Sequence, residues 1–370
     1  MFNPNKLIIY SLLLFTLIAC KKEYYKDISK LKLKTVRDFS DLDETPSSLK
    51  RANNTEYLMV VGTGHSSQNT LLLTDQSLFE KERIHNPYKI HDYIMLPDGR
   101  VLISQVYSGD LANLAIISKD FSKREQFSVG LPSAPRLHLA DDGIIMISAS
   151  GNVGVPVVAK YDFDFVELWR KEFSGIRSHL SEYYAPTDNI YIFDIYNNLY
   201  ELDGFNGTVT NEFGLSTEPW DITRDGNSLY LFGYENDGTY CGDDLEILKL
   251  NVNGTELWNV QLGRYGANDI ATQILVKDGL VYVCGAYGES NCLEGITSNH
   301  KDFYVAVLSE DGQVLGHRIE NYEEDYTTGR AISLAPSPYS NSGAYLLGIK
   351  DVKDGEQNVS VYKIETKRLE

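Results

Sequence analysis

The chain lacks the local motifs by which many enzymes are recognised. No Gly-x-Ser-x-Gly elbow, Walker loop or His-Glu-x-x-His run occurs in its 370 residues. Gly62-Thr63-Gly64 does not begin a dinucleotide fingerprint, because Ser67 stands where the third glycine belongs and no helical pattern follows. The sequence therefore gives no positive argument for an enzyme or a cofactor, and a non-enzymatic role is the more direct interpretation.

Basic side chains are also scarce. The chain has 34 lysines and arginines against 52 acidic residues, a net charge of −18. Nucleic acids and anionic lipid surfaces both require a basic face on the protein that binds them. This balance excludes both as main partners.

Long apolar runs are absent beyond the N-terminus. There, Lys6 precedes the apolar segment 7–15, which is too short to cross a bilayer about 30 Å thick. The following Leu17-Ile18-Ala19-Cys20 resembles the lipobox of bacterial lipoproteins, in which the cysteine is lipidated and becomes the new N-terminus. We therefore expect a signal peptide over 1–19, a lipid on Cys20 and a tether over 20–30. An ordinary secretory signal is the alternative.

One pattern is present seven times: an apolar strand, a tight Asp, Asn or Gly turn, and a second apolar strand that usually carries an aromatic residue. A strand-only repeat of roughly 40 to 50 residues is typical of a β-propeller. The turns are Asn53-Asn54, Asp98-Gly99, Asp142-Gly143, Asp188-Asn189, Asp225-Gly226, Asp278-Gly279 and Ser342-Gly343.

Each unit continues with a third strand, and the first six have a fourth, more polar strand, as expected of an open outer edge. The seventh unit lacks a fourth strand because the sequence stops at Glu370. Residues 31–36 alternate like a strand and precede the first unit, so we expect them to complete blade seven. The predicted fold is all-β: a seven-bladed propeller of four-stranded blades in one domain, residues 31–370.

Two phrases, 244–258 and 276–285, carry a family resemblance. Each resembles part of the repeat of the SBBP and PQQ-like propellers: a strand ending in Asp or Asn, a Gly turn, Leu-Trp, and later an Asp-Gly turn before a Tyr-Val strand. Only Trp169 and Trp258 occupy the tryptophan position, and Gly316 replaces it in blade six. The resemblance implies a propeller that serves as a scaffold or binding platform.

Four cysteines are present, and Cys20 is assigned to the lipid. Cys241 and Cys292 fall in equivalent loops of neighbouring blades, so we expect them to form a disulfide in an exported protein. Free thiols, or a bond that uses Cys284, are the alternatives; Cys284 lies inside a strand, where packing is the simple expectation. No two cysteines have the spacing of a zinc site, so no metal site is predicted.

Histidines His85, His91, His138 and His179 fall in or before the first strands of blades two to four. First strands line the channel of a propeller, so these side chains are candidates for a shared ligand or metal site. Their positions relative to the following turn differ, however, and we expect individual, hydrogen-bonded histidines instead.

The loops between second and third strands lengthen late in the chain by our sequence boundaries, whereas blades two to four make this connection with a few residues. These loops are rich in acid and are the predicted partner-binding surface, because acidic loops attract a basic partner. Their acidic residues are Glu235, Asp237, Asp243, Asp244, Glu289, Glu294, Asp351 and Asp354. Tolerated surface insertions are the alternative.

The sequence thus predicts a non-enzymatic, lipid-anchored platform at the bacterial outer membrane, on its periplasmic or cell-surface side. Its partner is expected to be another envelope protein or a glycan, and its domain a monomer. The alternatives are an extracytoplasmic glycan lyase or hydrolase and a carbohydrate-binding surface lipoprotein.

Overall fold

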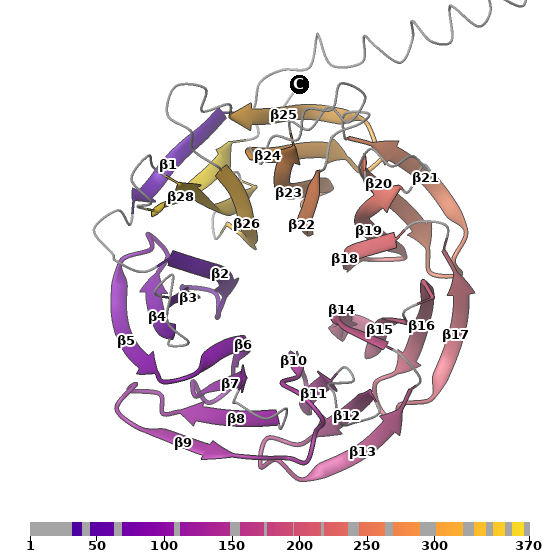
Figure 1. Cartoon of the computed structure of the whole chain (residues 1–370). Helices are drawn as coiled ribbons and strands as arrows, with labels where there is room; N and C mark the ends of the chain where they lie inside the picture. The colour runs from indigo at the N-terminus through magenta and orange to yellow at the C-terminus, as the bar shows by residue number, and fades with distance from the viewer. Residues whose placement is uncertain are drawn as a thin grey trace, which may run out of the picture.

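Seven four-stranded antiparallel sheets stand around a central axis as the blades of a propeller (Figure 1). This arrangement confirms the predicted all-β, seven-bladed fold. The computed structural model describes residues 32–38, 45–62, 69–106, 112–148, 156–173, 176–194, 196–215, 218–235, 244–262, 269–288, 301–320, 329–337, 343–351 and 357–365.

Within blades one to six, the four strands follow one another in sequence from the axis to the rim. Blades one to three contain β2 (Thr45–Arg51), β3 (Glu56–Gly62), β4 (Asn69–Asp75), β5 (Glu80–Asn86); β6 (Lys89–Met95), β7 (Val101–Val106), β8 (Ala112–Ile117), β9 (Arg124–Phe127); β10 (Arg136–Ala140), β11 (Gly143–Ser148), β12 (Val157–Tyr161) and β13 (Glu167–Glu172). Blades four to six contain β14 (Ile176–Tyr184), β15 (Asn189–Asp194), β16 (Asn198–Asp203), β17 (Val209–Gly214); β18 (Glu218–Asp225), β19 (Ser228–Glu235), β20 (Asp244–Asn251), β21 (Glu256–Gln261); β22 (Ile270–Lys277), β23 (Leu280–Gly288), β24 (Lys301–Ser309) and β25 (Val314–Glu320). One 3-10 turn, η1 (Ala185–Thr187), joins β14 to β15. Of the residues described, no helix is long and apolar enough to cross a membrane.

Blade seven is built from both ends of the chain. Its inner strands β26 (Gly329–Pro336), β27 (Ala344–Asp351) and β28 (Gln357–Glu365) come from the C-terminal part, and β1 (Lys32–Asp38) supplies the outermost strand. β1 runs antiparallel to β28, with Lys32 opposite Glu365 and Asp38 opposite Ser360. The predicted closure is confirmed, although the strand spans Lys32–Asp38 instead of 31–36.

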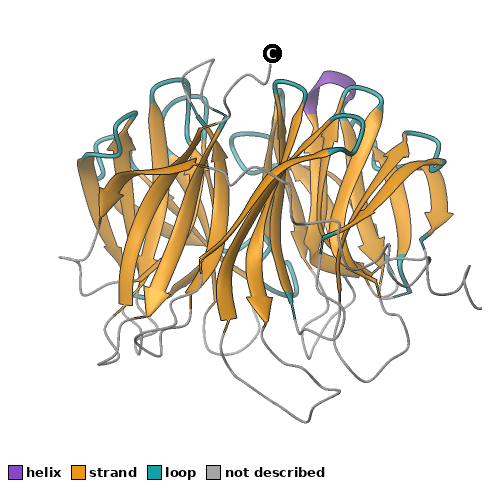
Figure 2. Cartoon of the chain, turned by 90° about the horizontal axis from the view of Figure 1, so that it is seen from above, coloured by secondary structure: helices purple, strands orange, loops and turns teal. Residues whose placement is uncertain are grey.

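The connections between strands divide between two faces of the ring (Figure 2). Turns from first to second strands and from third to fourth strands lie on one face, which we call the turn face. Second strands end and third strands begin on the opposite face, where fourth strands also end; we call it the loop face. Because Lys32 pairs with the end of β28, β1 begins on the turn face and runs toward the loop face.

Burial follows position within the blade. Every residue of β11, a second strand, is buried, whereas no residue of β13, an outermost strand, is buried. A second strand has sheet neighbours on both sides and blades on both faces, and an outermost strand has an open edge. The polar fourth strands predicted from the sequence therefore occupy the rim.

Seven clusters of buried apolar side chains fill the junctions between blades. One of them joins blades seven and one, with Leu49 and Tyr57 packed beside Tyr345 and Val361. Each blade therefore has two apolar faces, and each face is covered by a neighbour. The main core of the protein is distributed around the ring in this way.

In blades one to three, a large side chain from the turn between third and fourth strands helps to fill the junction with the preceding blade. Leu78, Phe121 and Phe165 all have positive φ angles, and all pack in these junction clusters. A left-handed conformation costs an L-residue about 1–2 kcal/mol, but burying such a side chain contributes about 1.5–3 kcal/mol. Burial can therefore offset the unfavourable backbone conformation.

In blades four to six, glycine takes the positive-φ position of the same turn, and an aromatic ring of the preceding blade lies against it. A Cβ built on these glycines would lie within 3.0 Å of the ring, so any other residue would displace it. The pairs are Gly207 with Trp169, Gly254 with Phe213 and Gly312 with Trp258.

A hydrogen bond accompanies each of these aromatic contacts. A side chain of the preceding blade donates to the first carbonyl after the third strand of the next blade: Trp169 Nε1 to Gly204 O at 3.0 Å, Asn211 Nδ2 to Val252 O at 3.4 Å, and Trp258 Nε1 to Glu310 O at 3.0 Å. Lys249 Nζ also donates to the Glu310 carbonyl, at 2.9 Å. Polar and apolar contacts thus fix the same turn.

Replacing Gly312 with alanine should destabilise the ring more than replacing Gly279. Both glycines have positive φ, but a Cβ on Gly312 meets Trp258 at 2.9 Å, whereas a Cβ on Gly279 meets nothing within 4 Å. We expect Gly312→Ala to lower the free energy of unfolding by about 1–3 kcal/mol more than Gly279→Ala. Chemical denaturation measures both values, and the excess should disappear in a Trp258→Ala background. Equal costs for the two alanines would contradict this packing.

Candidate functional site in the central channel

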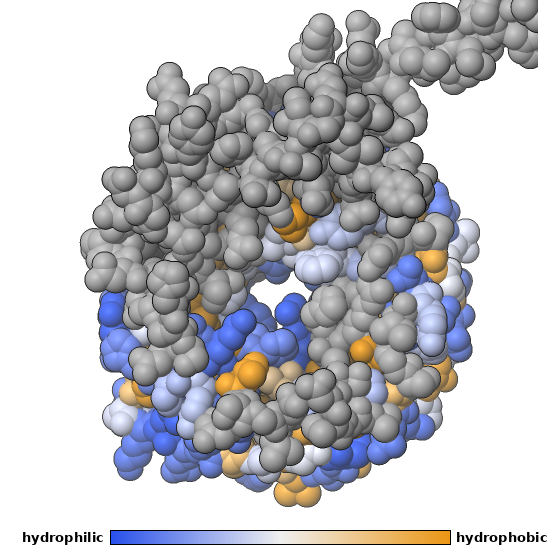
Figure 3. Space-filling view, viewed as in Figure 1, coloured by the Kyte–Doolittle hydropathy of each residue, from blue (hydrophilic) through white to orange (hydrophobic). Residues whose placement is uncertain are grey.

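The first strands of the seven blades surround a central channel. They are β2, β6, β10, β14, β18, β22 and β26. Seen along the axis, the ring has an opening at its centre, and the side chains around it are largely hydrophilic (Figure 3). Each first strand has one edge on the channel, and its polar side chains range from buried, as Asp92 is, to partly exposed, as Arg136 is.

β-bulges in several first strands direct polar side chains toward the next blade. Asp92, Asp221, Gln273 and Ser333 each follow such a bulge. Each accepts a hydrogen bond from a backbone N–H of the next blade: Leu137 N to Asp92 Oδ2 at 2.8 Å, Ile274 N to Asp221 Oδ2 at 2.9 Å, Leu334 N to Gln273 Oε1 at 2.6 Å and Leu49 N to Ser333 Oγ at 3.3 Å. The inner wall is therefore bonded from blade to blade.

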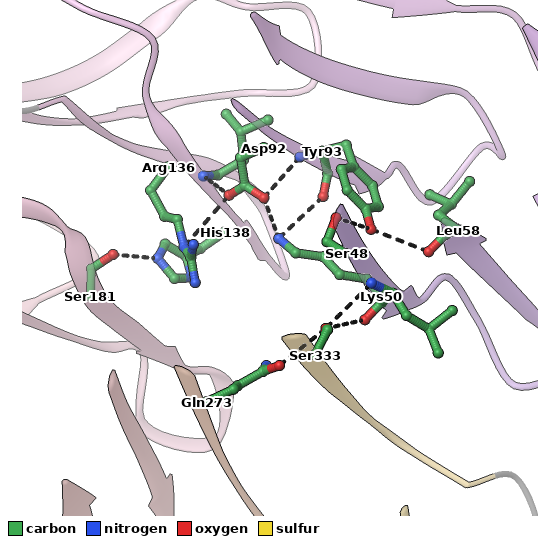
Figure 4. Close-up of polar contacts among 12 residues, drawn as sticks. Ser48, Lys50, Leu58, Asp92, Tyr93, Arg136, His138, Ser181, Gln273 and Ser333 are labelled. Carbon is green, nitrogen blue, oxygen red and sulfur yellow. Dashed lines mark hydrogen bonds and ion pairs between the residues drawn. The ribbon is translucent and has the colours of Figure 1, made fainter. Parts of the chain in front are cut away.

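Three charged side chains converge where blades one to three meet (Figure 4). Lys50 Nζ forms a hydrogen-bonded ion pair with Asp92 Oδ1, and Arg136 Nε lies 3.7 Å from Asp92 Oδ2. Burial opposes ionisation of Asp92, whose side chain is only 2% exposed, but Lys50 and Arg136 outweigh burial and lower its pKa. Asp92 is thus an anion held between two cations.

Two further carboxyl groups lie on the next two inner strands. Glu182 is on β14 and Asp221 on β18. Burial, reinforced by the charge of Asp221, raises the pKa of Glu182 to about 8. Burial also raises the pKa of Asp221 to about 6. Neither carboxyl has a cation within 4.0 Å in the part of the chain that the structure describes.

The histidines are separated. His85 lies on the outermost strand β5, with Nδ1 2.8 Å from Thr70 Oγ1, so its expected place in or before a channel strand is corrected. His91 and His138 lie on inner strands, and His138 Nε2 is 3.0 Å from Ser181 Oγ. Burial, with Arg136 nearby, lowers the pKa of His138 to about 3, so its ring is neutral at pH 7. His179 lies in β14, and its side chain is outside the description.

Within the described ranges, no three His, Cys, Asp or Glu side chains form a group suited to a metal ion. Cys284 is buried in the cluster between blades six and seven, where burial raises the pKa of its thiol. The other predicted site residues lie outside the described side chains. Cys20, Cys241, Cys292, Asp237, Asp243, Glu289, Glu294 and Asp354 are outside the described residues altogether, and Glu235, Asp244 and Asp351 are strand-terminal residues at the loop face.

The predicted late lengthening of the loops is wrong in part. The connection of blade three, from Ser148 to Val157, has as many intervening residues as that of blade five. The connection of blade seven, from Asp351 to Gln357, has as few intervening residues as that of blade two, from Val106 to Ala112. Only the connection of blade six, between Gly288 and Lys301, is clearly longer than the rest. The expected bounds of the late loops agree with the strand ends to within one or two residues, and the error lies in blade three, whose connection was expected to be short.

The charged channel residues were not identified from the sequence. Asp92 and Asp221 occupy one position in their strands, directly after a bulge and before a buried apolar residue. An acidic residue directly before an apolar residue in a first strand, as in Asp92-Tyr93 and Asp221-Ile222, was the available signal. This acidic residue can be recognised as a recurring channel position only after the first strands of the repeats are aligned on their bulges.

Comparison with known proteins identifies the fold. No family model and no curated protein sequence matches the chain. Among solved structures, BamB from Moraxella catarrhalis has a TM-score of 0.50 at 12% identity, over 90% of this chain and 100% of that one. The WD40 domain of Toxoplasma gondii coronin has a TM-score of 0.58 at 10% identity, over 92% and 88%. The β-propeller domain of Myceliophteria thermophila Cps50 (Swd1) has a TM-score of 0.61 at 9% identity, over 90% and 100%. At such low identities, the likeness establishes the propeller fold alone.

The carboxyl group of Glu182 should make stability depend on pH. Its folded pKa is about 8 against an ordinary 4.5, so the folded protein holds this proton more tightly than the unfolded chain. The Glu182 contribution to the free energy of unfolding therefore falls as pH rises from about 4.5 to about 8. Glu182→Gln should remove this fall and gain at least about 1 kcal/mol over the native chain at pH 8, with little difference at pH 4.5.

Chemical denaturation across this pH range tests the prediction. Glu125→Gln is the matched control, since Glu125 is an exposed residue of the outermost strand β9. If Glu182→Gln and Glu125→Gln show the same pH profile, Glu182 is ionised in the folded protein at neutral pH and the assignment is wrong.

Proposed function

We propose that this protein is a lipid-anchored propeller of the bacterial cell envelope that binds another protein through its loop face. The observation that carries the proposal is the difference between its two faces. No connection on the turn face has as many residues as the longest connection on the loop face, between Gly288 and Lys301 of blade six. The fold does not require that length, since six other blades make the connection with fewer residues.

Exposed aromatic side chains on the loop face support this role. Tyr196, in the blade-four connection, is 74% exposed, and Trp220, near the start of β18, is 41% exposed. The ring of Trp220 packs edge-on against Tyr234 at 6.1 Å, and Tyr234 Oη accepts a hydrogen bond from Ala271 N at 3.0 Å. Tyrosine and tryptophan on a rigid support are typical of protein-interaction surfaces.

The anchor is proposed from Leu17-Ile18-Ala19-Cys20, and the place of β1 supports a particular orientation. A lipid on Cys20 would reach the ring through residues 21–31, and β1 begins on the turn face. Eleven linking residues extend at most about 40 Å. The turn face would therefore be directed toward the membrane, and the loop face away from it, toward a partner.

The acidic loops and the Cys241–Cys292 disulfide belong to this proposal. The acidic residues of blades five to seven would attract a basic surface on the partner. A disulfide between two neighbouring loops would lower the conformational entropy lost on binding. The similarity to SBBP and PQQ-like repeats stays a prediction, and it agrees with a scaffold role.

Affinity capture of the tagged chain from native membranes tests the proposal. The native chain should incorporate lipid and capture a partner, and Cys20→Ala should abolish lipid incorporation and membrane attachment. Shortening the blade-six connection between Gly288 and Lys301 should abolish capture without unfolding the ring. Shortening the blade-three connection between Ser148 and Val157 is the matched control and should retain capture.

Lipid incorporation by the Cys20→Ala chain would end the assignment of the anchor. Capture that is unchanged by the blade-six deletion would show that the loop face at blade six is not the binding surface.

A further inference from the structure

The guanidinium group of Arg136 has N–H donors at the channel that form no hydrogen bond with a described residue. Of its contacts with described residues, the structure gives one, the 3.7 Å approach of Nε to Asp92 Oδ2. The side chain is 33% exposed, and it projects from the innermost strand β10. An arginine has five N–H donors in a planar fork that matches a carboxylate. The terminal nitrogens of Arg136 are therefore available to a ligand.

Asp92 does not satisfy the hydrogen-bond donors of Arg136, because both oxygens of the Asp92 carboxylate accept hydrogen bonds from other donors. Oδ1 accepts from Lys50 and from Tyr93 N at 2.9 Å, and Oδ2 accepts from Leu137 N at 2.8 Å. Lys50 is itself 35% exposed. One buried acid thus holds two cations in place, and the trio keeps an excess positive charge. Burial lowers the pKa of His91 and of His138, so neither ring adds charge at pH 7.

The carboxyl groups of Glu182 and Asp221 lack a cationic partner among the described residues, whereas Arg136 and Lys50 have positive charge to offer a ligand. Their side chains are half-buried on neighbouring inner strands, and no described cation lies within ion-pair distance of either. Asp221 is fixed by Ile274 N, and Thr223 forms a hydrogen bond with Glu182. Lys50 and Arg136 are near enough to lower the pKa of both groups, yet burial keeps both raised. A cationic group between them would supply the missing partner.

We propose that the channel binds a small amphoteric molecule, with its carboxylate on Arg136 and Lys50 and its amine on Glu182 and Asp221. Arg136 and Lys50 supply the positive charge for the carboxylate, and Asp221, together with Glu182 once it ionises beside the amine, supplies the negative charge for the amine. A ligand with an anion alone would leave the two carboxyl groups without a partner. A ligand with a cation alone would leave the Arg136 fork unused. This site is independent of the proposed loop-face partner.

Short glycine peptides are suitable probes, because they carry both charges at a separation set by their length and have no side chains. Calorimetric titration of the full domain with glycine, diglycine, triglycine and tetraglycine should find at least one that binds. Its N-acetyl and C-terminal amide derivatives each lack one charge, and both should bind at least tenfold more weakly.

Variants assign the two ends. Arg136→Gln should weaken binding of the best peptide at least tenfold but hardly change binding of its amide, which has no carboxylate to lose. Glu182→Gln should likewise weaken the peptide but not its N-acetyl form. Arg83→Gln on β5 and Glu125→Gln on β9 are matched charge changes on outermost strands, and both should bind like the native chain. Thermal unfolding of each variant separates lost binding from lost folding.

A proton readout distinguishes a contact with the amine from a general effect of charge. Glu182 holds its proton at pH 7, and an amine beside it favours ionisation, so binding should release protons. Titration in two buffers of different ionisation enthalpy measures this release, and Glu182→Gln should reduce it strongly. Binding by none of the peptides, equal binding by the capped derivatives, or peptide affinity unchanged in Arg136→Gln would overturn the proposal.

Discussion

The whole structure depends on one constraint: a blade with two apolar faces is stable only between two neighbours. A single four-stranded sheet of this chain would expose the side chains that now form two junction clusters, such as those of blade six. Stacking the blades in a circle removes every exposed face, provided that the circle closes. Closure is achieved by β1, which crosses from the N-terminus to pair with β28. Hydrogen bonds along the inner wall also join neighbouring blades. At the closing junction, Ser333 of blade seven is hydrogen-bonded to the backbone N–H and carbonyl of Leu49 in blade one.

The apolar face between two blades can be covered by different side chains at the same position, the turn between the third and fourth strands. Blades one to three fill the space at the turn face from the turn itself, as Phe121 does, and accept an unfavourable backbone conformation. Blades four to six leave the turn as glycine and fill the space from the previous blade, as Trp258 does over Gly312. A repeat signature based on tryptophan therefore detects only part of the ring, although the packing is shared. Because different side chains fill equivalent junctions, low sequence identity to other propellers is expected.

Much of the fold was accessible from the sequence because strand, turn and edge are local properties. Asp-Gly turns such as Asp98-Gly99 and Asp278-Gly279 mark where first strands end, and a missing fourth strand indicates that the chain ends must meet. The channel was not accessible, because a bulge decides which way a side chain of a first strand points. His85 was misplaced for a related reason, since strand ends are hard to locate from pattern alone. The side chains of Arg136 and Glu182 can be recognised as parts of one site only when the seven first strands are placed around one axis.

The most direct test of this account is the stability of a ring that has lost β1. A chain beginning at residue 39 is compared with one beginning at residue 31, which keeps β1 and lacks the lipid tether. We expect the shorter chain to melt at least about 5 °C lower, and amide hydrogens of β28 to exchange much faster, because β28 becomes an open edge. The same melting temperature and the same protection of β28 in both chains would contradict the claim that the ring depends on its closing strand.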